Sequence, residues 1–311
     1  MAEIVALGEL LMDCIIENGR ITQANPGGSP CNYLAAASKY GASCAYIGKV
    51  GDDAYGHVLE SALKNAGVDC GGMVKDLKCR TTQAFVRLAA NGEHHFSFNR
   101  DADVKLTDDE VDYALIDSCR IFHFAGSLSL TDEPCRTALH HAAEYAKRRG
   151  KLISFDPNIR LLAWKGDVDR ARDELAWGVR IADIIKVSED EADFLGVDPT
   201  GLLESTLLVM VTKGADGASL YTRKASVDIE CPKVNVVDTT GAGDIFNGAA
   251  ASRVMKLLNA STDSGLNDRQ LIDDLTEEQL AGIGRFAVNA ASYSTQRSGA
   301  IPSIPDIREI E

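Results

Sequence analysis

The sequence has no surplus of positive charge, no paired cysteine motif and no long apolar run, and each absence excludes a class of protein. Lys and Arg number 32 against 46 Asp and Glu, so the formal net charge is −14. A chain of that charge has no basic stripe for nucleic acid. No apolar run approaches the ~20 residues that a membrane helix needs. We therefore expect a protein that binds neither nucleic acid nor a membrane.

The eight cysteines are scattered and form no Cys-x-x-Cys pair, so neither a zinc site nor a disulfide framework is predicted. The N-terminus has no basic segment, and its apolar run soon meets Glu9 and Asp13, which is typical of a first strand and not of a signal peptide. Reduced thiols and a cytoplasmic location are the expectation.

Short apolar runs alternate with helical patterns along most of the 311 residues. This alternation predicts an α/β fold, a doubly wound and mostly parallel sheet flanked by helices, in a single domain over residues 1–311. The strands are expected at 4–10, 45–50, 120–125, 151–155, 184–187, 207–212, 218–222 and 234–237, and long helices at 58–66, 134–149 and 168–181.

Residues 70–100 have a different pattern. Thr81–Leu88 and His94–Phe98 alternate with period two, and Ala90-Asn91-Gly92 between them is typical of a hairpin turn. We expect a small antiparallel sheet here, joined by residues 12–24. A sheet placed over a site would act as a lid.

The stretch Asp238-Thr-Thr-Gly-Ala-Gly-Asp244 follows the predicted strand at 234–237, and a small-residue helix is expected to begin near Asp244. Helix N-termini carry unpaired N–H groups and a positive dipole end, and glycines let an anion approach the backbone. A carboxylate at this position is either an ordinary first-turn residue, worth about 0.3–1 kcal/mol, or a general base beside an anion site.

Two nucleotide-binding motifs are excluded. The Walker pattern Gly-x-x-x-x-Gly-Lys-Ser/Thr is absent. In the dinucleotide fingerprint, the third glycine would fall at Phe246, and the motif lies near the C-terminus and not at the first βα turn.

Residues 238–249 closely resemble the C-terminal signature of the ribokinase-like carbohydrate kinases. Gly27-Gly-Ser-Pro-Cys-Asn32, with Gly41 and Gly51 at matching spacing, resembles the N-terminal signature, although Leu34 stands where that pattern usually has a small residue. The resemblance runs from about residue 4 to residue 305 and implies the ribokinase-like fold.

Within that family, Gly27-Gly-Ser-Pro and Ser154-Phe-Asp-Pro-Asn-Ile-Arg160 are most similar to fructokinases. The 2-keto-3-deoxygluconate kinases carry a similar Asp-Pro-Asn-x-Arg stretch. The resemblance implies that Asp244 takes the proton of the attacking sugar hydroxyl. It also implies that the N–H groups of Gly241, Ala242 and Gly243 bind the γ-phosphoryl group.

The resemblance further implies a sugar site. Its residues would be Asp13, Gly27, Gly28 and Asn32, with Arg160 meeting substrate or phosphate. Without the resemblance, Asp13 is a solvated turn carboxylate and Asn32 a capping or core amide. Arg100 is the weaker of the two arginine candidates.

Residues Thr212, Gly214 and Gly217 resemble the family's nucleotide loop, in which Lys213 is expected to face solvent. Glu191 matches a residue that organises Mg²⁺ through water, but Ser188 and Glu191 also form a capping box that explains both without a metal. Adenine contacts stay unassigned, because the family asparagine would fall at Val288 and not at Asn289.

A monovalent-cation loop is also implied, with K⁺ as the expected ion. Its residues would be Asp238 and Thr240 from one segment and Ser294, Arg297, Gly299 and Ser303 from another, acting largely through backbone carbonyls.

The resulting expectation is an ATP- and Mg²⁺-dependent sugar kinase that phosphorylates the primary hydroxyl of fructose. The alternative acceptors are 2-keto-3-deoxygluconate, ribose and a nucleoside. A non-enzymatic alternative is an inactive, sugar-sensing relative. The resemblance also implies a homodimer, because edge strands of the lid often pair between subunits in that family.

Overall fold

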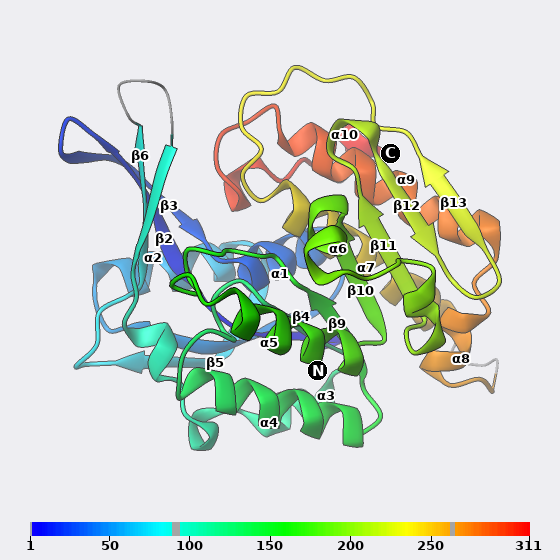
Figure 1. The fold of residues 1–311 in the computed structure, drawn as a ribbon, viewed down its shortest axis with the longest axis horizontal. Helices are drawn as coiled ribbons and strands as arrows, with labels where there is room; N and C mark the ends of the chain where they lie inside the picture. Colours follow the sequence, from blue (N-terminus) through cyan, green and yellow to red (C-terminus); the bar gives the residue numbers. More distant parts are fainter. Residues whose placement is uncertain (1, 89–93, 262–264) are drawn as a thin grey trace.

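The computed structural model describes residues 2–88, 94–261 and 265–311, and its centre is a sheet of nine strands (Figure 1). The strand order is β13-β12-β11-β10-β9-β8-β1-β4-β5, with all neighbours parallel except the antiparallel β11–β12 and β12–β13 pairs. The strands are β1 (Ile4–Leu7), β4 (Cys44–Gly51), β5 (Val68–Asp76), β8 (Ile121–Ala125), β9 (Leu152–Asp156), β10 (Ile184–Ser188), β11 (Leu208–Thr212), β12 (Ala218–Tyr221) and β13 (Ser226–Ile229).

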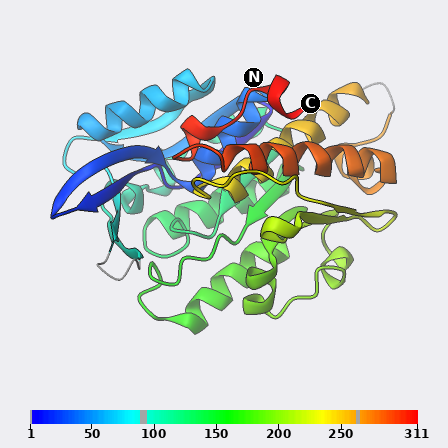
Figure 2. The same ribbon diagram turned by 90° about the horizontal axis from the view of Figure 1, so that it is seen from above.

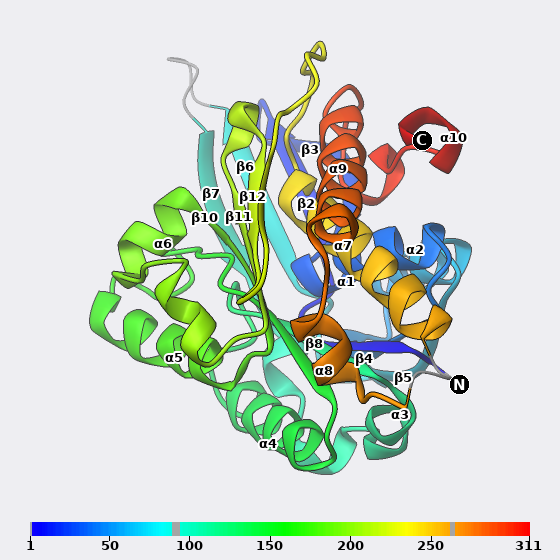
Figure 3. The same ribbon diagram turned by 90° about the vertical axis from the view of Figure 1, so that its right-hand side faces the viewer.

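Helices cover both faces of this sheet, so its parallel strands are apolar on both sides (Figure 3). One core cluster lies under α1, α2, α7, α8, α9 and α10, and the other under α3, α4, α5 and α6. The helices are α1 (Ser29–Lys39), α2 (Ala54–Asn65), α3 (Tyr113–Ser118), α4 (Cys135–Arg148), α5 (Val168–Ile181), α6 (Glu189–Leu195), α7 (Ala242–Ala260), α8 (Asp268–Asp273), α9 (Glu277–Ser294) and α10 (Ile307–Ile310). The predicted doubly wound architecture is confirmed.

A second sheet of four strands stands away from the first (Figures 1 and 2). It contains β3 (Arg20–Gly27), β2 (Leu11–Glu17), β6 (Gln83–Leu88) and β7 (His94–Asn99) in that order. The β2–β3 and β6–β7 pairs are antiparallel, as predicted, whereas the central β2–β6 pair is parallel. The expected turn at 90–92 lies outside the described residues.

The start of the predicted lid at residue 70 is corrected by the structure. Residues 68–76 form β5, which pairs with β4 at the edge of the large sheet, because this segment continues the βα alternation after α2. Helix α2 begins at Ala54, four residues before the predicted start, where the Asp53 carboxylate accepts the Gly56 N–H.

The strand predicted at 234–237 is wrong. These residues have no regular structure, and the side chains of Val236 and Val237 are 61% and 68% exposed. The edge strand is β13 instead, which was not predicted because Ser226–Ile229 alternates weakly at a half-exposed edge. The apolar run was therefore a connection between β13 and α7.

Helix α7 begins at Ala242, two residues earlier than expected, so Asp244 is its third residue. The capping box predicted at Ser188 is present and starts α6, and the structure has further capping boxes at Thr107 and at Thr276, where α9 starts. Within the described residues, no helix is long and apolar enough to cross a membrane.

Candidate functional site

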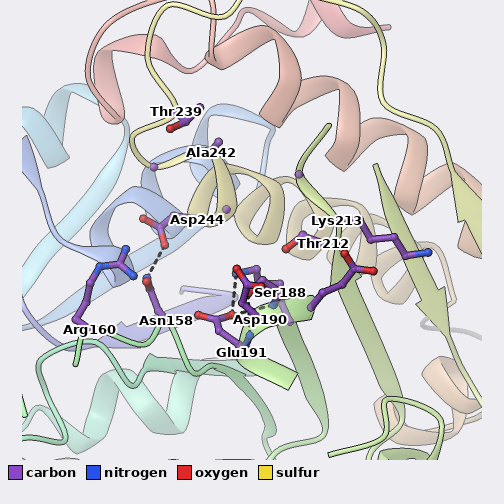
Figure 4. Close-up of a pocket in the computed structure, with 15 residues that line it drawn as sticks. Asn158, Arg160, Ser188, Asp190, Glu191, Thr212, Lys213, Thr239, Ala242 and Asp244 are labelled. Atoms are coloured by element: carbon purple, nitrogen blue, oxygen red, sulfur yellow. Dashed lines mark hydrogen bonds and ion pairs between the residues drawn. The ribbon is translucent and has the colours of Figure 1, made fainter. Parts of the chain in front are cut away.

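An open cavity of about 500 Å³ lies where β9, β10 and β11 end and α7 begins (Figure 4). In open α/β sheets, ligands bind at the carboxyl ends of the strands, so this is the expected place for a site. The residues that line the cavity are Asn158, Arg160, Lys186, Ser188, Glu189, Asp190, Glu191, Thr212, Lys213, Gly214, Thr239, Gly241, Ala242, Gly243 and Asp244.

The carboxylate of Asp244 lies at one end of this cavity and is held by three side chains. Its Oδ1 accepts hydrogen bonds from Ser29 Oγ at 2.6 Å and Asn158 Nδ2 at 3.1 Å, and its Oδ2 accepts one from Asn32 Nδ2 at 2.9 Å. Burial raises the pKa of Asp244, while the bonds from Ser29 and Asn32 and the charges of Arg160 and Lys186 oppose that rise. A carboxylate with a raised pKa and a fixed orientation is suited to take a proton.

Backbone N–H groups point from the start of α7 into the same cavity. Gly241 is the N-cap, with a left-handed φ of 74°, and no acceptor within the described residues takes the N–H of Gly241 or Gly243. The Ala242 N–H is different, because it donates to the Thr239 carbonyl at 3.2 Å. The free groups of the predicted anion site are therefore those of Gly241 and Gly243, at the positive end of a 19-residue helix.

Lys186 reaches the anion site and was missed by the sequence analysis. Its buried Nζ lies 3.3 Å from Asp156 Oδ2 and 3.6 Å from Glu191 Oε2. It also lies about as close to the point where a Cβ on Gly243 would stand. Burial alone lowers the pKa of Lys186, but Asp156 and Glu191 outweigh burial and raise it, so the ammonium stays charged.

Two further residues of the site were not singled out from the sequence. Asn158 has a left-handed φ of 38° and donates to both Ser29 Oγ and Asp244 Oδ1. Ser29 is the first residue of α1 and is buried. A lysine inside an apolar strand, as at 186, was the clearest signal available, because lysine is rarely buried without a partner.

The amino acids predicted to bind the sugar lie together beside Asp244. Gly27 packs directly on Asp13, since a Cβ at position 27 would collide with the Asp13 carboxylate, and Gly28 is the N-cap of α1, the helix that carries Asn32. Burial raises the pKa of Asp13 to about 7, and the negative charge of Asp244 adds to this, while Arg160 opposes it.

The two arginine candidates differ in their partners. Arg160 lines the cavity beside Asn158 and Asp244 (Figure 4), and its guanidinium donates to its neighbour's carbonyl, that of Ile159. Arg100 is instead committed to ion pairs with Asp103 at 2.6 Å and Asp132 at 3.2 Å. Arg100 therefore anchors the exit of β7 to the body of the protein.

The predicted nucleotide loop lies only partly in the cavity. Thr212 and Gly214 line it, while Gly217 packs against β13, where a side chain would collide with the Ile229 carbonyl. Lys213, which was expected to face solvent, points away from Asp244 in Figure 4, and its half-buried side chain pairs with Asp228 at 3.2 Å.

Glu191 is held in place by neighbouring groups. Oε1 accepts the Ile159 N–H at 3.0 Å and Oε2 accepts the Ser188 N–H at 2.8 Å, and Lys186 lies beside Oε2. Burial raises the pKa of Glu191, but Lys186 and the two N–H groups outweigh it and lower the pKa, so the carboxylate is charged. Among the described residues, no cluster of three or more His, Cys, Asp or Glu has the arrangement of a metal site.

The predicted cation loop comes together around the Asp238 carboxylate. Oδ1 accepts from the N–H and the hydroxyl of Thr240, and Oδ2 accepts from the Gly299 N–H at 2.8 Å. These bonds lower the pKa of Asp238 against the effect of burial. The Asp238 side chain therefore ties the segment before α7 to the segment after α9.

The other residues expected around the cation use their side chains elsewhere. Ser294 Oγ donates to the Ala291 carbonyl, Ser303 Oγ donates to the Ala300 carbonyl at 2.8 Å, and the Arg297 guanidinium pairs with Glu309. The backbone carbonyls of these three residues are the expected ligands, and the Ser294 carbonyl also accepts the Arg297 N–H.

Comparison with known proteins gives one matching family model, described as the pfkB family carbohydrate kinase, over residues 1–307. Fructokinase-1 of Zea mays is 39% identical over 99% of this chain and 96% of its own length. A probable fructokinase-2 of Arabidopsis thaliana is 38% identical over 97% of this chain and 92% of its own length.

Solved structures give the same result. A sugar kinase of Pyrococcus horikoshii in complex with ATP has a TM-score of 0.83 and 30% identity, over 99% of this chain and all of its own. A fructokinase of Xylella fastidiosa with bound ATP has a TM-score of 0.85 and 26% identity, over 100% of this chain and 97% of its own. A Vibrio cholerae fructokinase double mutant bound to fructose, ADP and potassium has a TM-score of 0.82 and 25% identity, over 99% and 98% of the two chains.

Proposed function

Because the chain belongs to the pfkB family of carbohydrate kinases, we propose that it transfers the γ-phosphoryl group of ATP to the primary hydroxyl of fructose. The resemblance to ribokinase-like kinases, and to fructokinases in particular, is confirmed. The protein is an ATP-dependent sugar kinase. The observation that carries the fructokinase proposal is the place of Asp244, between the Asp13–Asn32 region and the free N–H groups of α7.

Phosphoryl transfer depends mainly on positioning and on charge stabilisation, and the site supplies both. In the proposal, Asp244 takes the proton of the sugar hydroxyl as its oxygen attacks the γ-phosphorus. The N–H groups of Gly241 and Gly243 and the ammonium of Lys186 stabilise charge on the transferring group. The loop with Thr212 and Gly214 borders the nucleotide.

The charges beside Asp244 favour a neutral sugar over an acid. Asp13 and Asp244 interact unfavourably, and Arg160 offsets them. The carboxylate of 2-keto-3-deoxygluconate would add a third negative charge to this region, whereas hydroxyls of fructose can donate to both carboxylates. Asp13, Gly27, Gly28, Asn32 and Arg160 are the proposed sugar contacts.

Magnesium is the proposed divalent ion, because ATP is normally used as its magnesium complex. Glu191 is charged and borders the cavity, but both of its oxygens already accept N–H groups. Each carboxylate oxygen has a second lone pair, so Glu191 fits a water-mediated contact better than a direct one. The ion would neutralise charge on the phosphates of ATP.

We propose that a monovalent cation, K⁺ in particular, occupies the loop tied by Asp238. The Asp238 carboxylate already accepts from Thr240, Gly299 and Ser298, so ligation would come largely from backbone carbonyls of Asp238, Thr240, Ser294, Arg297, Gly299 and Ser303. Such an ion would lie outside the sugar site and would shape the start of α7.

The chain is proposed to form one kinase domain in which the four-stranded sheet serves as a lid. Closure of a lid would exclude water and limit hydrolysis of ATP.

The edge strand β3 carries Ile21, whose side chain is 45% exposed, so pairing of two lids in a homodimer is proposed as well. Sedimentation equilibrium would test the dimer. The eight unpaired cysteines suit the reducing cytoplasm, which cell fractionation would test.

An acceptor screen tests the proposed function. ADP formation is followed with ATP and, in turn, fructose, ribose, 2-keto-3-deoxygluconate and a nucleoside, and the acceptors are compared by kcat/KM. We expect fructose to exceed each of the others by at least about tenfold. A higher kcat/KM for another acceptor would reassign the substrate. Sugar binding without ADP formation would support the inactive, sugar-sensing alternative.

A further inference from the structure

The hydroxyl of Ser29 lies between Asn158 and Asp244 in the buried part of the site. Asn158 Nδ2 is 2.6 Å from Ser29 Oγ, and Ser29 Oγ is 2.6 Å from Asp244 Oδ1. Asn158 Nδ2 also reaches Asp244 Oδ1 directly, at 3.1 Å. The three side chains therefore form a closed triangle of hydrogen bonds.

The direction of each bond in this triangle is fixed by chemistry. An amide nitrogen only donates, so the Ser29 hydroxyl must accept from Asn158. An ionised carboxylate only accepts, so the single hydrogen of the Ser29 hydroxyl must point to Asp244. As a result, Asp244 Oδ1 accepts from two donors, Ser29 and Asn158, which crowd this oxygen.

The second carboxylate oxygen is less occupied. Asp244 Oδ2 accepts one hydrogen bond, from Asn32 Nδ2, and keeps one lone pair for another donor. We propose that Ser29 is a positioning residue that leaves Oδ2 of Asp244 as the oxygen that takes the proton of the sugar hydroxyl. This inference rests on the proposed role of Asp244 as the base.

In the reaction, the sugar O–H bond breaks and its proton passes to Asp244 Oδ2. The sugar oxygen forms a bond to the γ-phosphorus as the bond from that phosphorus to ADP breaks. Ser29 and Asn158 stay on Oδ1 throughout, so the carboxyl group does not rotate when it becomes neutral. Ser29 gives no proton and touches neither substrate.

The backbone of Ser29 is itself held by a buried carboxylate. Its N–H lies 3.4 Å from Oε1 of Glu9, a buried carboxylate that also accepts from the hydroxyls of Ser127 and Ser129. Ser29 is also the first residue of α1, directly after the N-cap. The backbone that carries the hydroxyl is therefore fixed beside Asp244.

Ser29 also affects the acidity of Asp244. A donor to the ionised carboxylate stabilises it, so the Ser29 hydroxyl lowers the pKa of Asp244 against the effect of burial. Other groups that act on Asp244 come from four segments of the chain and are unaltered by a change at Ser29. They are Asp13 on β2, Asp156 on β9, Arg160 after β9, Lys186 on β10, and Cys31 and Asn32 on α1.

The test is the pH dependence of kcat in the full-length Ser29→Ala enzyme with fructose and ATP. Loss of one hydrogen bond to a charged carboxylate moves the acid limb of the kcat profile upward by about one pH unit. At pH values below the acid limb of the parent, kcat then falls about tenfold below the parent, and the gap closes at pH values above both limbs. The KM for fructose stays within about twofold, because Ser29 does not contact the sugar.

Ser252→Ala is the matched control, because Ser252 is a buried serine on α7 whose Oγ bonds only the Ala249 carbonyl among the described residues. The acid limb of the kcat profile of Ser252→Ala stays at the same pH as in the parent enzyme. Ser29→Cys, which keeps the volume and a weak donor, gives an intermediate shift and replaces Ser29→Ala if that variant does not fold.

An unshifted acid limb in a folded Ser29 variant, or an equal shift in Ser252→Ala, would overturn the inference. Asp244→Asn separates this failure from failure of the proposed function. If Asp244→Asn is inactive while the Ser29 variants titrate like the parent, only the role of Ser29 is lost. If Asp244→Asn turns over normally, the base assignment itself fails.

Discussion

Asn32 Nδ2 lies 2.9 Å from Asp244 Oδ2, although 212 residues separate the two in the chain. The contact joins α1 to α7, which pack side by side along one face of the large sheet (Figure 3). One helix begins with the glycines next to Asp13 and the other with the free N–H groups of the cavity. The proposed base, Asp244, therefore lies where the starts of the two helices meet.

Replacement of Asn32 by leucine should damage the sugar side of the reaction and spare the nucleotide side. The variant loses the donor on Asp244 Oδ2, and the buried Asn32 Oδ1, which has no partner within the described residues, can no longer accept a sugar hydroxyl. We expect kcat/KM for fructose to fall about 10²-fold, at about 1.4 kcal/mol per tenfold, with the KM for ATP little changed. Equal increases in the KM for fructose and in the KM for ATP would contradict the assignment of Asn32 to the sugar side of the reaction.

Asp13→Asn should stabilise the protein at high pH. The pKa of Asp13 is raised to about 7 in the folded chain, against about 3.9 for a free aspartate. A carboxyl with a raised folded-state pKa contributes stability at low pH that is lost as the pH rises through about 7. The asparagine variant carries no such loss.

Urea unfolding without ligands at pH 8 and at pH 4.5 measures this effect. We expect a higher free energy of unfolding for Asp13→Asn at pH 8 and a smaller advantage at pH 4.5. An advantage that grows as the pH falls would show that Asp13 is stabilised in its charged form. Sugar affinity, measured separately, should fall in the same variant.

Lys186→Met should lower kcat by about 10²-fold or more, because a charge beside the transferring group acts mainly in the transition state. The substitution also leaves Asp156 and Glu191 without their shared cation, so both carboxyls will bind protons more readily. Lys213→Met is the matched control, since Lys213 borders the same cavity but pairs with Asp228 outside it. Equal kcat values for the two variants would remove Lys186 from the reaction.

Much of the fold follows from the sequence because buried strands and capped helices have local signals. The run Ile184–Val187 and the box Ser188–Glu191 predict β10 and α6 at the observed positions. Val234–Val237 has the same apolar signal but no neighbouring strand to pair with, and burial depends on such partners. The residue pattern within one segment does not show whether another strand will lie beside it.

The residues of the candidate site were likewise predicted only in part. Asp244 and the glycines before it were predicted because they form one contiguous motif. Lys186 and Ser29 have functional surroundings only after distant segments meet, Lys186 through Asp156 and Ser29 through Asn158. Their own neighbours in the sequence read as a strand and a helix start.

The cation loop predicts a dependence on monovalent ions. We expect kcat to rise about tenfold when K⁺ replaces tetramethylammonium at constant ionic strength, because an ordered loop fixes the start of α7. Asp238→Ala removes the bonds to Thr240 and Gly299 and should abolish this activation. Asp228→Ala, at another surface aspartate, should keep it. A K⁺ response that survives in Asp238→Ala would place the ion elsewhere.

The most direct test of the account is the single-turnover rate of Asp244→Asn with saturating fructose and ATP. Asparagine keeps the size of the side chain and its contact with the Ser29 hydroxyl, but it cannot accept the proton of the sugar. We predict that the variant binds fructose and ATP with affinities near those of the parent and that phosphoryl transfer slows by about 10³-fold or more. A transfer rate within about tenfold of the parent would contradict the role of Asp244 as the base.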